Sequence, residues 1–419
     1  MQQEIQGEIA GGPSAPVNGG TADVLIFAIE AGRYGPARLP QNLDAVGLKV
    51  ATLCPEDNVL AQTDHAACHY RLPSSRSAPQ LARALMAALT RSQARLVIPA
   101  DEQTVVLLHH FIRGGCAKII GVEGLAVLVR SLGRPDRLGA MLFKSQTLAL
   151  ARDLGLRVPP GGTAGFAGEA LHIADQLGYP VYVKRSFGWS GLGVERCADA
   201  AALVAAMGTR PGGSLVAGAK RQLRHWLQRD WYPETSDMDV QGMVAGKPAF
   251  YCALAWQGQM VGGYAGEALS TTSDTGPSSE VRVGAHAGMG EATRRMIEAL
   301  GCNGWVGFDF ILEEGTGEPV LLECNPRPIQ VCHLGYRIGV DLAAELARLL
   351  RGGAMPAKPL EASQELDVVL FPYALDPARQ RPGALGDIPG KDAKLMKYGA
   401  SLAGGGAALR RGWWRGPAV

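Results

Sequence analysis

The sequence carries two apolar stretches that contain acidic residues, Gly307-Phe308-Asp309-Phe310-Ile311 and Leu321-Leu322-Glu323-Cys324-Asn325-Pro326-Arg327. Asp309 lies within an apolar run, where a carboxylate is costly to bury unless it is paired or bound to a metal. Glu323 and Asn325 are two residues apart, so on an extended strand both side chains point to one face. Three oxygen ligands from two adjacent strands suit a hard cation such as Mg²⁺ or Mn²⁺, which takes water and phosphate oxygens as further ligands.

Arg327 continues the same row, two residues after Asn325, and could bind an anion beside that metal. An alternative interpretation needs no ligand: these polar residues would form a structural cluster of salt bridges. Replacing Glu323 would then lower the stability of the protein and leave Arg327 unpaired. Asp, Glu, Asn and Arg together at the ends of apolar strands favour the ligand-binding interpretation.

A lysine and a glycine-rich loop follow another strand-like run, Pro180-Val-Tyr-Val-Lys184-Arg-Ser-Phe-Gly188-Trp-Ser-Gly191-Leu-Gly193. The backbone N–H groups of such a loop can surround a polyphosphate, and Lys184 adds a positive charge. The loop is not a P-loop, because its lysine precedes the glycines, and it does not open a helix as dinucleotide-binding glycines do. A plain connection between strands would have a similar composition, so the loop alone does not decide between the two interpretations.

Two further regions complete the pattern. Residues 137–154 have helical spacing, and Lys144 on this segment would by itself be an ordinary exposed helix lysine. In the first 130 residues, short apolar runs at 24–29, 49–54 and 96–99 alternate with helical stretches, which predicts a doubly wound parallel sheet. Loops at the carboxyl ends of such strands often hold ligands. The pair Asp101-Glu102 follows one of these runs, and its simpler interpretation is a helix cap with an acid in the first turn.

The order of these elements resembles the ATP-grasp superfamily: a helix lysine, a strand lysine with a glycine-rich lid, a hinge, and then Asp…Glu-x-Asn-x-Arg. The resemblance covers about residues 135–352, and the string from Glu323 to Arg327 is its most specific part. It implies an α/β (α+β grasp) fold, in which an N-terminal doubly wound parallel α/β domain precedes a two-lobed ATP-grasp domain and a short C-terminal extension. The expected division is a flexible N-terminal tail (1–20), a Rossmann-like domain (21–134), the ATP-grasp domain (135–352, with a small lid lobe at about 145–238 and a metal and substrate lobe at about 239–352) and the extension (353–419).

The resemblance also implies ATP and Mg²⁺ (or Mn²⁺) as cofactors, with a role for each matching residue. Lys144 and Lys184 would hold the ATP phosphates, and Arg327 would stabilise the transferred phosphoryl group and the acyl phosphate. Glu323 would bridge the metal ions that Asp309 and Asn325 also ligate. The lid over the phosphates would be formed by Ser186, Gly188, Ser190, Gly191 and Gly193.

The hinge that pairs with adenine resembles Val240-Gln241-Gly242-Met243-Val244. Gly242 stands where the superfamily commonly has an acidic residue, so the resemblance assigns no ribose-binding group. Arg282 is a second candidate for an anion-binding arginine. The predicted catalytic residues are thus Arg327, Arg282 and Lys184.

Composition narrows the class of protein. The 41 Lys and Arg nearly balance the 39 Asp and Glu, which argues against a nucleic-acid or polybasic membrane binder. The eight cysteines form no C-x-x-C pair, and no apolar run reaches the length of a membrane span, so we expect reduced thiols in a cytoplasmic protein. A homodimer is a common arrangement in the superfamily, although nothing in the sequence bears on oligomeric state.

The expected function is ATP-dependent ligation of a small carboxylic or amino acid to an amine, through an acyl phosphate, with ADP and phosphate as products. Two alternatives stay open: an ATP-grasp kinase or phosphotransferase, and a non-catalytic ATP-binding module. Biotin-dependent carboxylation is less favoured, because the chain contains no Met-Lys-Met segment. No general base for the amine can be identified from the sequence.

Overall fold

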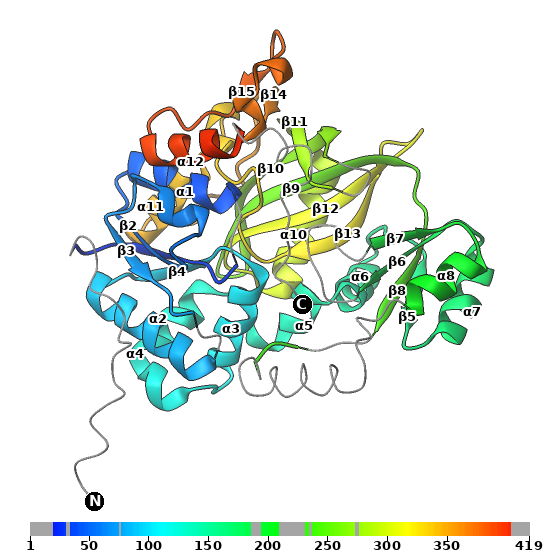
Figure 1. Cartoon of the computed structure of the whole chain (residues 1–419), viewed down its shortest axis with the longest axis horizontal. Helices are drawn as coiled ribbons and strands as arrows, with labels where there is room; N and C mark the ends of the chain where they lie inside the picture. The colour runs from blue at the N-terminus through cyan, green and yellow to red at the C-terminus, as the bar shows by residue number, and fades with distance from the viewer. Residues whose placement is uncertain are drawn as a thin grey trace, which may run out of the picture.

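The computed structural model describes residues 20–30, 34–74, 77–185, 194–208, 231–233, 237–272 and 276–403. These residues build three β-sheets, which follow one another along the chain (Figure 1). The fold is α/β: a parallel sheet comes first, and the antiparallel sheets of an ATP-grasp fold follow, as the sequence predicts. In the described residues, no helix combines the length and apolar character that crossing a bilayer requires.

The first sheet contains four parallel strands in the order β3-β2-β1-β4. Their bounds are β1 Val24–Phe27, β2 Val50–Cys54, β3 Cys68–Arg71 and β4 Leu96–Pro99. Strand β1 is fully buried because both faces of the sheet are covered, which explains its unbroken apolar sequence. The covering helices are α1 (Tyr34–Ala45), α2 (Ala78–Ser92), α3 (Glu102–Ile112) and α4 (Ala117–Ser131). The strand order reverses between β1 and β4, and the carboxyl ends of the strands at such a reversal are where open α/β sheets usually bind ligands.

The second sheet is small and antiparallel, with strand order β5-β8-β6-β7. Its strands are β5 (Gly161–Ala164), β6 (Val181–Arg185), β7 (Val194–Cys197) and β8 (Met238–Gly242). Helices α7 (Ala167–Leu177) and α8 (Ala200–Gly208) cover one face of it around a small apolar core that includes Val183 and Val240. Because β8 pairs with β5 and β6, the chain leaves this sheet at residues 243–245, slightly after the expected lobe boundary at 238/239.

The third sheet has seven strands in the order β13-β12-β9-β10-β11-β14-β15. Its longest strands are β9 (Gly246–Trp256), β10 (Gln259–Thr271) and β12 (Gly304–Glu313). The others are β11 (Ser278–Gly284), β13 (Pro319–Asn325), β14 (Leu366–Val369) and β15 (Leu385–Gly386). Helix α10 (Ala287–Leu300) packs on one face, against β9 and β10, and α11 (Leu342–Leu350) contacts the same two strands and α1.

The chain between the first two sheets forms two helices instead of the single one expected over 137–154. Helix α5 (Leu138–Leu142) ends at Phe143, which is extended, and α6 (Lys144–Asp153) starts directly after it. A short 3-10 turn (Pro135–Arg137) precedes α5. Both helices contact β13, and the break places Lys144 at the start of α6, beside that strand.

The C-terminal segment adds strands β14 and β15 to the large sheet and ends in helix α12 (Ala393–Ala403). Asp387 in this segment forms a buried ion pair with Arg38 of α1, with 2.8 Å between Oδ1 and Nη2. Asp392 accepts a hydrogen bond from the Thr63 hydroxyl at 2.6 Å. The extension therefore packs back onto the first sheet's domain as well as onto the large sheet.

Helix α1 lies against the loop after β13 at a position that has room only for glycine. A Cβ on Gly35 would lie 2.5 Å from the Gln330 Cα and 2.6 Å from the Ile329 carbonyl oxygen. Both are backbone atoms, so neither can move aside cheaply.

We predict that Gly35→Ala lowers the free energy of unfolding by about 1–3 kcal/mol, because α1 must shift away from this loop. Chemical denaturation measures the change. Gly208→Ala is the matched control, since Gly208 also lies in a helix but a Cβ at that position would have no neighbouring atom within 4 Å. Equal stability of the two variants would contradict the close packing.

Candidate functional site

The acidic residues meet on neighbouring strands of the large sheet. Asp309 on β12 lies directly opposite Glu323 on β13, and Gly307 lies opposite Asn325. Residues opposite one another in an antiparallel pair share a face, so Asp309, Glu323 and Asn325 lie on one side of the sheet, as their spacing predicts. Two carboxylates are thus placed side by side at the end of the sheet.

A chain of hydrogen bonds joins these residues to Arg327. The Asn325 amide donates to Asp309 Oδ2 at 3.2 Å, and Arg327 Nη2 donates to Asn325 Oδ1 at 3.1 Å. Burial, together with the neighbouring Glu323 carboxylate, raises the pKa of the Asp309 carboxyl well above its usual value. Arg327 is itself buried, and its Nε has no hydrogen-bond partner among the described residues. A buried guanidinium N–H without a partner is costly and favours an anionic ligand at this position.

Lys144 is part of the same cluster and is not an exposed helix lysine. It is 8% exposed, and its ammonium lies 2.8 Å from Glu323 Oε2. Burial acts to raise the pKa of the Glu323 carboxyl, but the charges of Lys144 and Lys184 and the hydrogen bonds with Asp309 and Lys144 together hold that pKa below its usual value. The ion-pair partner of Glu323 is therefore Lys144. The salt-bridge alternative had assigned Arg327 to Glu323, but Arg327 pairs with a different carboxylate.

Lys184 approaches the cluster from the small sheet. It lies on β6 directly opposite Asp239 of β8, and Asp239 Oδ1 accepts a hydrogen bond from Thr163 at 3.0 Å. Burial lowers the pKa of the Lys184 ammonium. The Glu323 carboxylate acts to raise this pKa, and the Lys144 ammonium acts to lower it. Val183 and Val240 point into the core under α7 and α8, so Lys184, Asp239 and Gln241 share the opposite face. Asp239 was not predicted as a site residue, although its two-residue spacing from Gln241 places both on one face.

The predicted hinge residues lie where the chain passes from the small sheet to the large one. Gln241 and Gly242 end β8, and Met243 and Val244 follow in the connection to β9. The Gly242 N–H donates to the Pro160 carbonyl at 2.9 Å, so it is already used within the small sheet. The buried Gln241 Nε2 has no hydrogen-bond partner among the described residues. This amide nitrogen is therefore a donor without a partner in the described part of the chain, near the expected adenine position. The predicted lid residues Ser186, Gly188, Ser190, Gly191 and Gly193 lie outside the described part of the chain.

The structure does not bring Arg282 to this cluster, so its predicted role at the site is wrong. It lies on β11, three strands from β12, which is about 14 Å at the usual strand spacing. Across the sheet, Arg282 is aligned with Glu267, Ala249 and Phe310 on the successive neighbouring strands. Asp309 is adjacent to Phe310 on β12, so its side chain points to the opposite face of the sheet from that of Arg282. Its guanidinium forms a two-point ion pair with Asp367 of β14, at 2.6 and 3.0 Å.

The site also receives a residue from the first sheet's domain. Asp101 is the helix cap that the sequence predicts: it accepts the Thr104 N–H at 2.7 Å and the Ile29 N–H at 2.7 Å. Glu102 does more than occupy the first turn. It is 5% exposed and forms an ion pair with Arg327, with 2.6 Å between Oε1 and Nη2. No local sequence signal predicts this contact, because the two residues are 225 positions apart.

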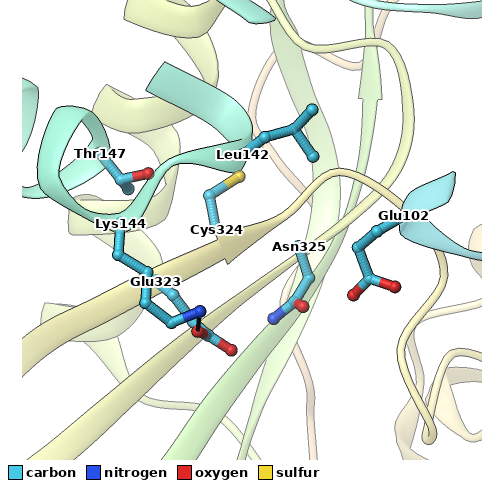
Figure 2. A pocket seen from close by; sticks show the side chains of 7 residues that line it. All are labelled: Glu102, Leu142, Lys144, Thr147, Glu323, Cys324 and Asn325. Atoms are coloured by element: carbon cyan, nitrogen blue, oxygen red, sulfur yellow. Dashed lines mark ion pairs between the residues drawn. The ribbon is translucent and has the colours of Figure 1, made fainter. Parts of the chain in front are cut away.

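A small pocket lies between these groups. Figure 2 shows the polar ends of Glu102, Lys144, Glu323 and Asn325 together on one side of it. Leu142, Thr147 and Cys324 form the rest of its wall. The pocket therefore carries charged groups from α3, α6 and β13.

The donor set fits a magnesium ion that shares its coordination with phosphate. In the described residues, no three His, Cys, Asp or Glu side chains gather as a self-sufficient metal site. Asp309 and Glu323 supply two adjacent carboxylates, and the Asn325 amide lies beside them. Mg²⁺ is typically held by one or two carboxylates, with water and substrate phosphates completing its octahedron. The lysines at this position would neutralise those phosphates.

Comparisons with known proteins agree with this architecture. Residues 144–223 match the family described as the ATP-binding domain of the carbamoyl-phosphate synthase L chain, and residues 256–330 match an ATP-grasp domain family. Over these two ranges the chain resembles the ATP-grasp superfamily. The two matched ranges include Lys144, Lys184, Asp309, Glu323 and Arg327.

Curated relatives include carbamoyl phosphate synthase large chains. That of Ralstonia nicotianae is 26% identical over 224 residues, which cover 53% of this chain and 20% of that protein. That of Gemmatimonas aurantiaca is 24% identical over 258 residues, which cover 61% of this chain and 21% of the relative. This chain thus spans about a fifth of the length of the curated relatives it matches.

Solved structures extend the similarity to most of the chain. A biotin carboxylase–ATP complex from Campylobacter jejuni has a TM-score of 0.59 at 16% identity, covering 83% of this chain and 75% of that one. An N5-carboxyaminoimidazole synthetase from Staphylococcus aureus has a TM-score of 0.56 at 15% identity, covering 84% and 83%. An L-amino acid ligase from Bacillus licheniformis has a TM-score of 0.53 at 15% identity, covering 79% and 75%. At these identities the similarity concerns the fold, which these enzymes share while their names differ in substrate.

We predict that Lys184→Ala weakens ATP binding by roughly 10- to 100-fold without unfolding the protein, since one charge-assisted phosphate contact contributes about 1.5–3 kcal/mol. Calorimetric titration with Mg²⁺ and ATP measures the affinity. Lys247→Ala removes a lysine that is 70% exposed on β9 and serves as the control. Unchanged ATP affinity in Lys184→Ala would refute the phosphate-binding role.

We predict that Glu323→Gln lowers Mg²⁺-dependent ADP release by at least 100-fold while the fold persists, because the change removes a metal-binding charge at constant size. Melting temperature and ADP release are measured on the same preparation. The salt-bridge interpretation predicts the reverse: a large loss of stability, since Lys144 would be left buried without its partner, and undiminished activity per folded molecule.

Proposed function

We propose that this chain is an ATP-dependent carboxylate–amine ligase. It would activate a small carboxylic or amino acid as an acyl phosphate and couple it to an amine, releasing ADP and phosphate. One observation carries this proposal: Lys144, Asp309, Glu323, Asn325 and Arg327 form a single contiguous cluster, and Lys184 adds its charge from the facing sheet. ATP and Mg²⁺ are the cofactors that this cluster would take.

The arrangement separates two charge-binding tasks. The lysines lie beside Glu323, where the phosphates and metal would be held, and they would neutralise charge on the phosphoryl oxygens as it is transferred. Arg327 lies at the other end of the hydrogen-bonded row, with a buried Nε–H that has no partner among the described residues. An acid whose carboxylate contacts this guanidinium would be held beside the transferred phosphoryl group.

The reaction would proceed in two displacements. A carboxylate oxygen of the acid attacks the γ-phosphorus, and the bond from that phosphorus to the ADP oxygen breaks. The amine nitrogen then attacks the acyl carbon, the carbon–oxygen bond to phosphate breaks, and the departing phosphate takes the proton that the nitrogen loses. Bound Mg²⁺ would contribute charge neutralisation on the phosphoryl oxygens. Exclusion of water is needed throughout, because an acyl phosphate is readily hydrolysed.

We also propose a domain division, a class of partners, a cellular location and an oligomeric state for this protein. The division into a Rossmann-like domain (21–134), an ATP-grasp domain (135–352) and an extension (353–419) would place the acid and amine between the first two. The partners would be small molecules rather than nucleic acid or a membrane, in a cytoplasmic protein that pairs as a homodimer.

The decisive test is an ADP-release screen over pairs of amino acids and small carboxylates, followed by hydroxylamine trapping. We expect at least one acid to support ADP release and to yield a hydroxamate in equal amount, because only an acyl phosphate reacts in this way. A phosphorylated product without hydroxamate would identify the kinase alternative. Tight ATP binding without substrate-stimulated ADP release would identify the non-catalytic module.

A further inference from the structure

Helix α4 carries an apolar stripe on the face that points away from the rest of the protein. Among the described residues, eight large apolar side chains are exposed, and three of them lie on this helix. Val122 is 86% exposed, Leu125 is 37% exposed and Val129 is 53% exposed. Ala126 is also exposed, and spacings of three, four and seven residues from Val122 place all four side chains on one helix face. These four residues form one continuous surface, the α4 stripe.

The opposite face of α4 already holds the helix against the first sheet's domain. Gly124 and Leu128 are buried on that face, and α4 contacts α2, α3 and β4. A Cβ on Gly124 would lie 2.6 Å from the Met86 sulfur, so α4 and α2 are in close contact. Figure 1 shows α4 at the outer side of this domain, away from the large sheet. The α4 stripe therefore contributes little to packing among the described residues, and contiguous exposed apolar surfaces mark interaction sites.

Two opposite charges border the α4 stripe on the same side. Glu123 and Arg130 are both exposed and are seven residues apart, which is two helical turns, or about 10 Å along the axis. Neither forms an ion pair with another described residue, and Arg130 donates a long hydrogen bond of 3.4 Å to the Arg95 carbonyl. The stripe therefore has a negative side chain near its start and a positive one near its end.

This pattern matches itself when a second copy of the helix lies antiparallel to the first. A two-fold axis beside Leu125 places Val122 against the partner's Val129, and the reverse. Such an axis keeps the bordering charges of both copies on one side of the contact, and it brings Glu123 to within about 3 Å, along the helix axis, of the partner's Arg130. The pair of helices then contains two Glu–Arg contacts and no like-charge contact between these residues.

We propose that two copies of this chain pair through the α4 stripe, with their α4 helices antiparallel. The inference rests on the proposed homodimer, to which it gives a surface and a symmetry, but not on the ligase reaction. Charge favours a second copy over a lipid surface. Helices that lie on membranes carry mainly Lys and Arg on their polar face, whereas one acidic and one basic residue border this stripe.

The size of the surface sets the expected strength of the dimer. A stable interface takes about 800 Å² and about 20–30 residues from each partner. Helix α4 has 15 residues, of which the outward face is only a part. We therefore expect a weak dimer that forms in a concentration-dependent manner.

Sedimentation equilibrium of the full chain, from about 1 to 500 µM, measures the dimer dissociation constant. We expect the wild type to pass from monomer to dimer within this range. Val129→Asp should raise the dissociation constant at least tenfold, because it places carboxylates in the apolar contact. Val204→Asp is the matched control: Val204 is 45% exposed on α8, so the same change there should leave both the dissociation constant and the melting temperature unaltered.

The bordering charges test the antiparallel arrangement. In a homodimer, Glu123→Arg and Arg130→Glu each bring like charges together at two places. We expect each variant alone to associate at least fivefold more weakly than the wild type at low ionic strength. An equimolar mixture of the two variants should recover wild-type association, because each Glu–Arg position then holds opposite charges again. A parallel pairing or a non-specific apolar contact predicts no recovery.

Three results would overturn the inference. A wild type that stays monomeric up to 500 µM, including one that instead sediments with phosphatidylcholine–phosphatidylglycerol vesicles, would assign the α4 stripe to a different partner. A dimer that Val129→Asp leaves unchanged would place the pairing on another surface. A mixture of the two charge variants that associates no better than either alone would contradict the antiparallel pairing. The ligase reaction fails separately, by the absence of hydroxamate with every acid.

Discussion

The site depends on how two carboxylates are accommodated on adjacent strands. Asp309 and Glu323 lie directly opposite one another, which would destabilise the β12–β13 pair if both charges stood alone. Lys144 compensates Glu323, and the Asn325 amide links Asp309 to Arg327. Arg327 in turn is neutralised by Glu102. The start of α6, the start of α3 and the end of β13 are therefore held together by charge pairing that no one element could satisfy by itself.

Short-range periodicity made part of this site predictable. The two-residue spacing of Glu323 and Asn325 fixes their common face, and buried strands such as Val24–Phe27 show unbroken apolar sequence. Strand β3 was not predicted, because Cys68–Arg71 alternates buried and exposed positions with polar residues and lies at the edge of its sheet. Segment length and polarity there are no different from those of a loop.

Contacts between distant segments could not be read from the sequence in the same way. A lysine on an amphipathic segment looks the same whether it is solvated or buried, so only the break at Phe143 reveals why Lys144 reaches β13. Arg282 shows the converse error: an arginine near apolar strands attracted a catalytic role, whereas sheet register places it on the opposite face with Asp367. Register across three strands is a tertiary property, and no local pattern encodes it.

The order of strands in the small sheet has a mechanical consequence. The chain enters this sheet at β5 and leaves it at β8, and these two strands are neighbours whose ends are tied by the Gly242 N–H and the Pro160 carbonyl. These two strand ends thus lie side by side at one edge of the small sheet, while α7 and α8 enclose a core of their own. Trp231, between α8 and β8, is buried in the larger core instead, so it is a further attachment of this unit to the rest of the molecule. Lys184 is carried on a unit that is joined at both strand ends and again at Trp231, and its separation from Glu323 depends on all three attachments.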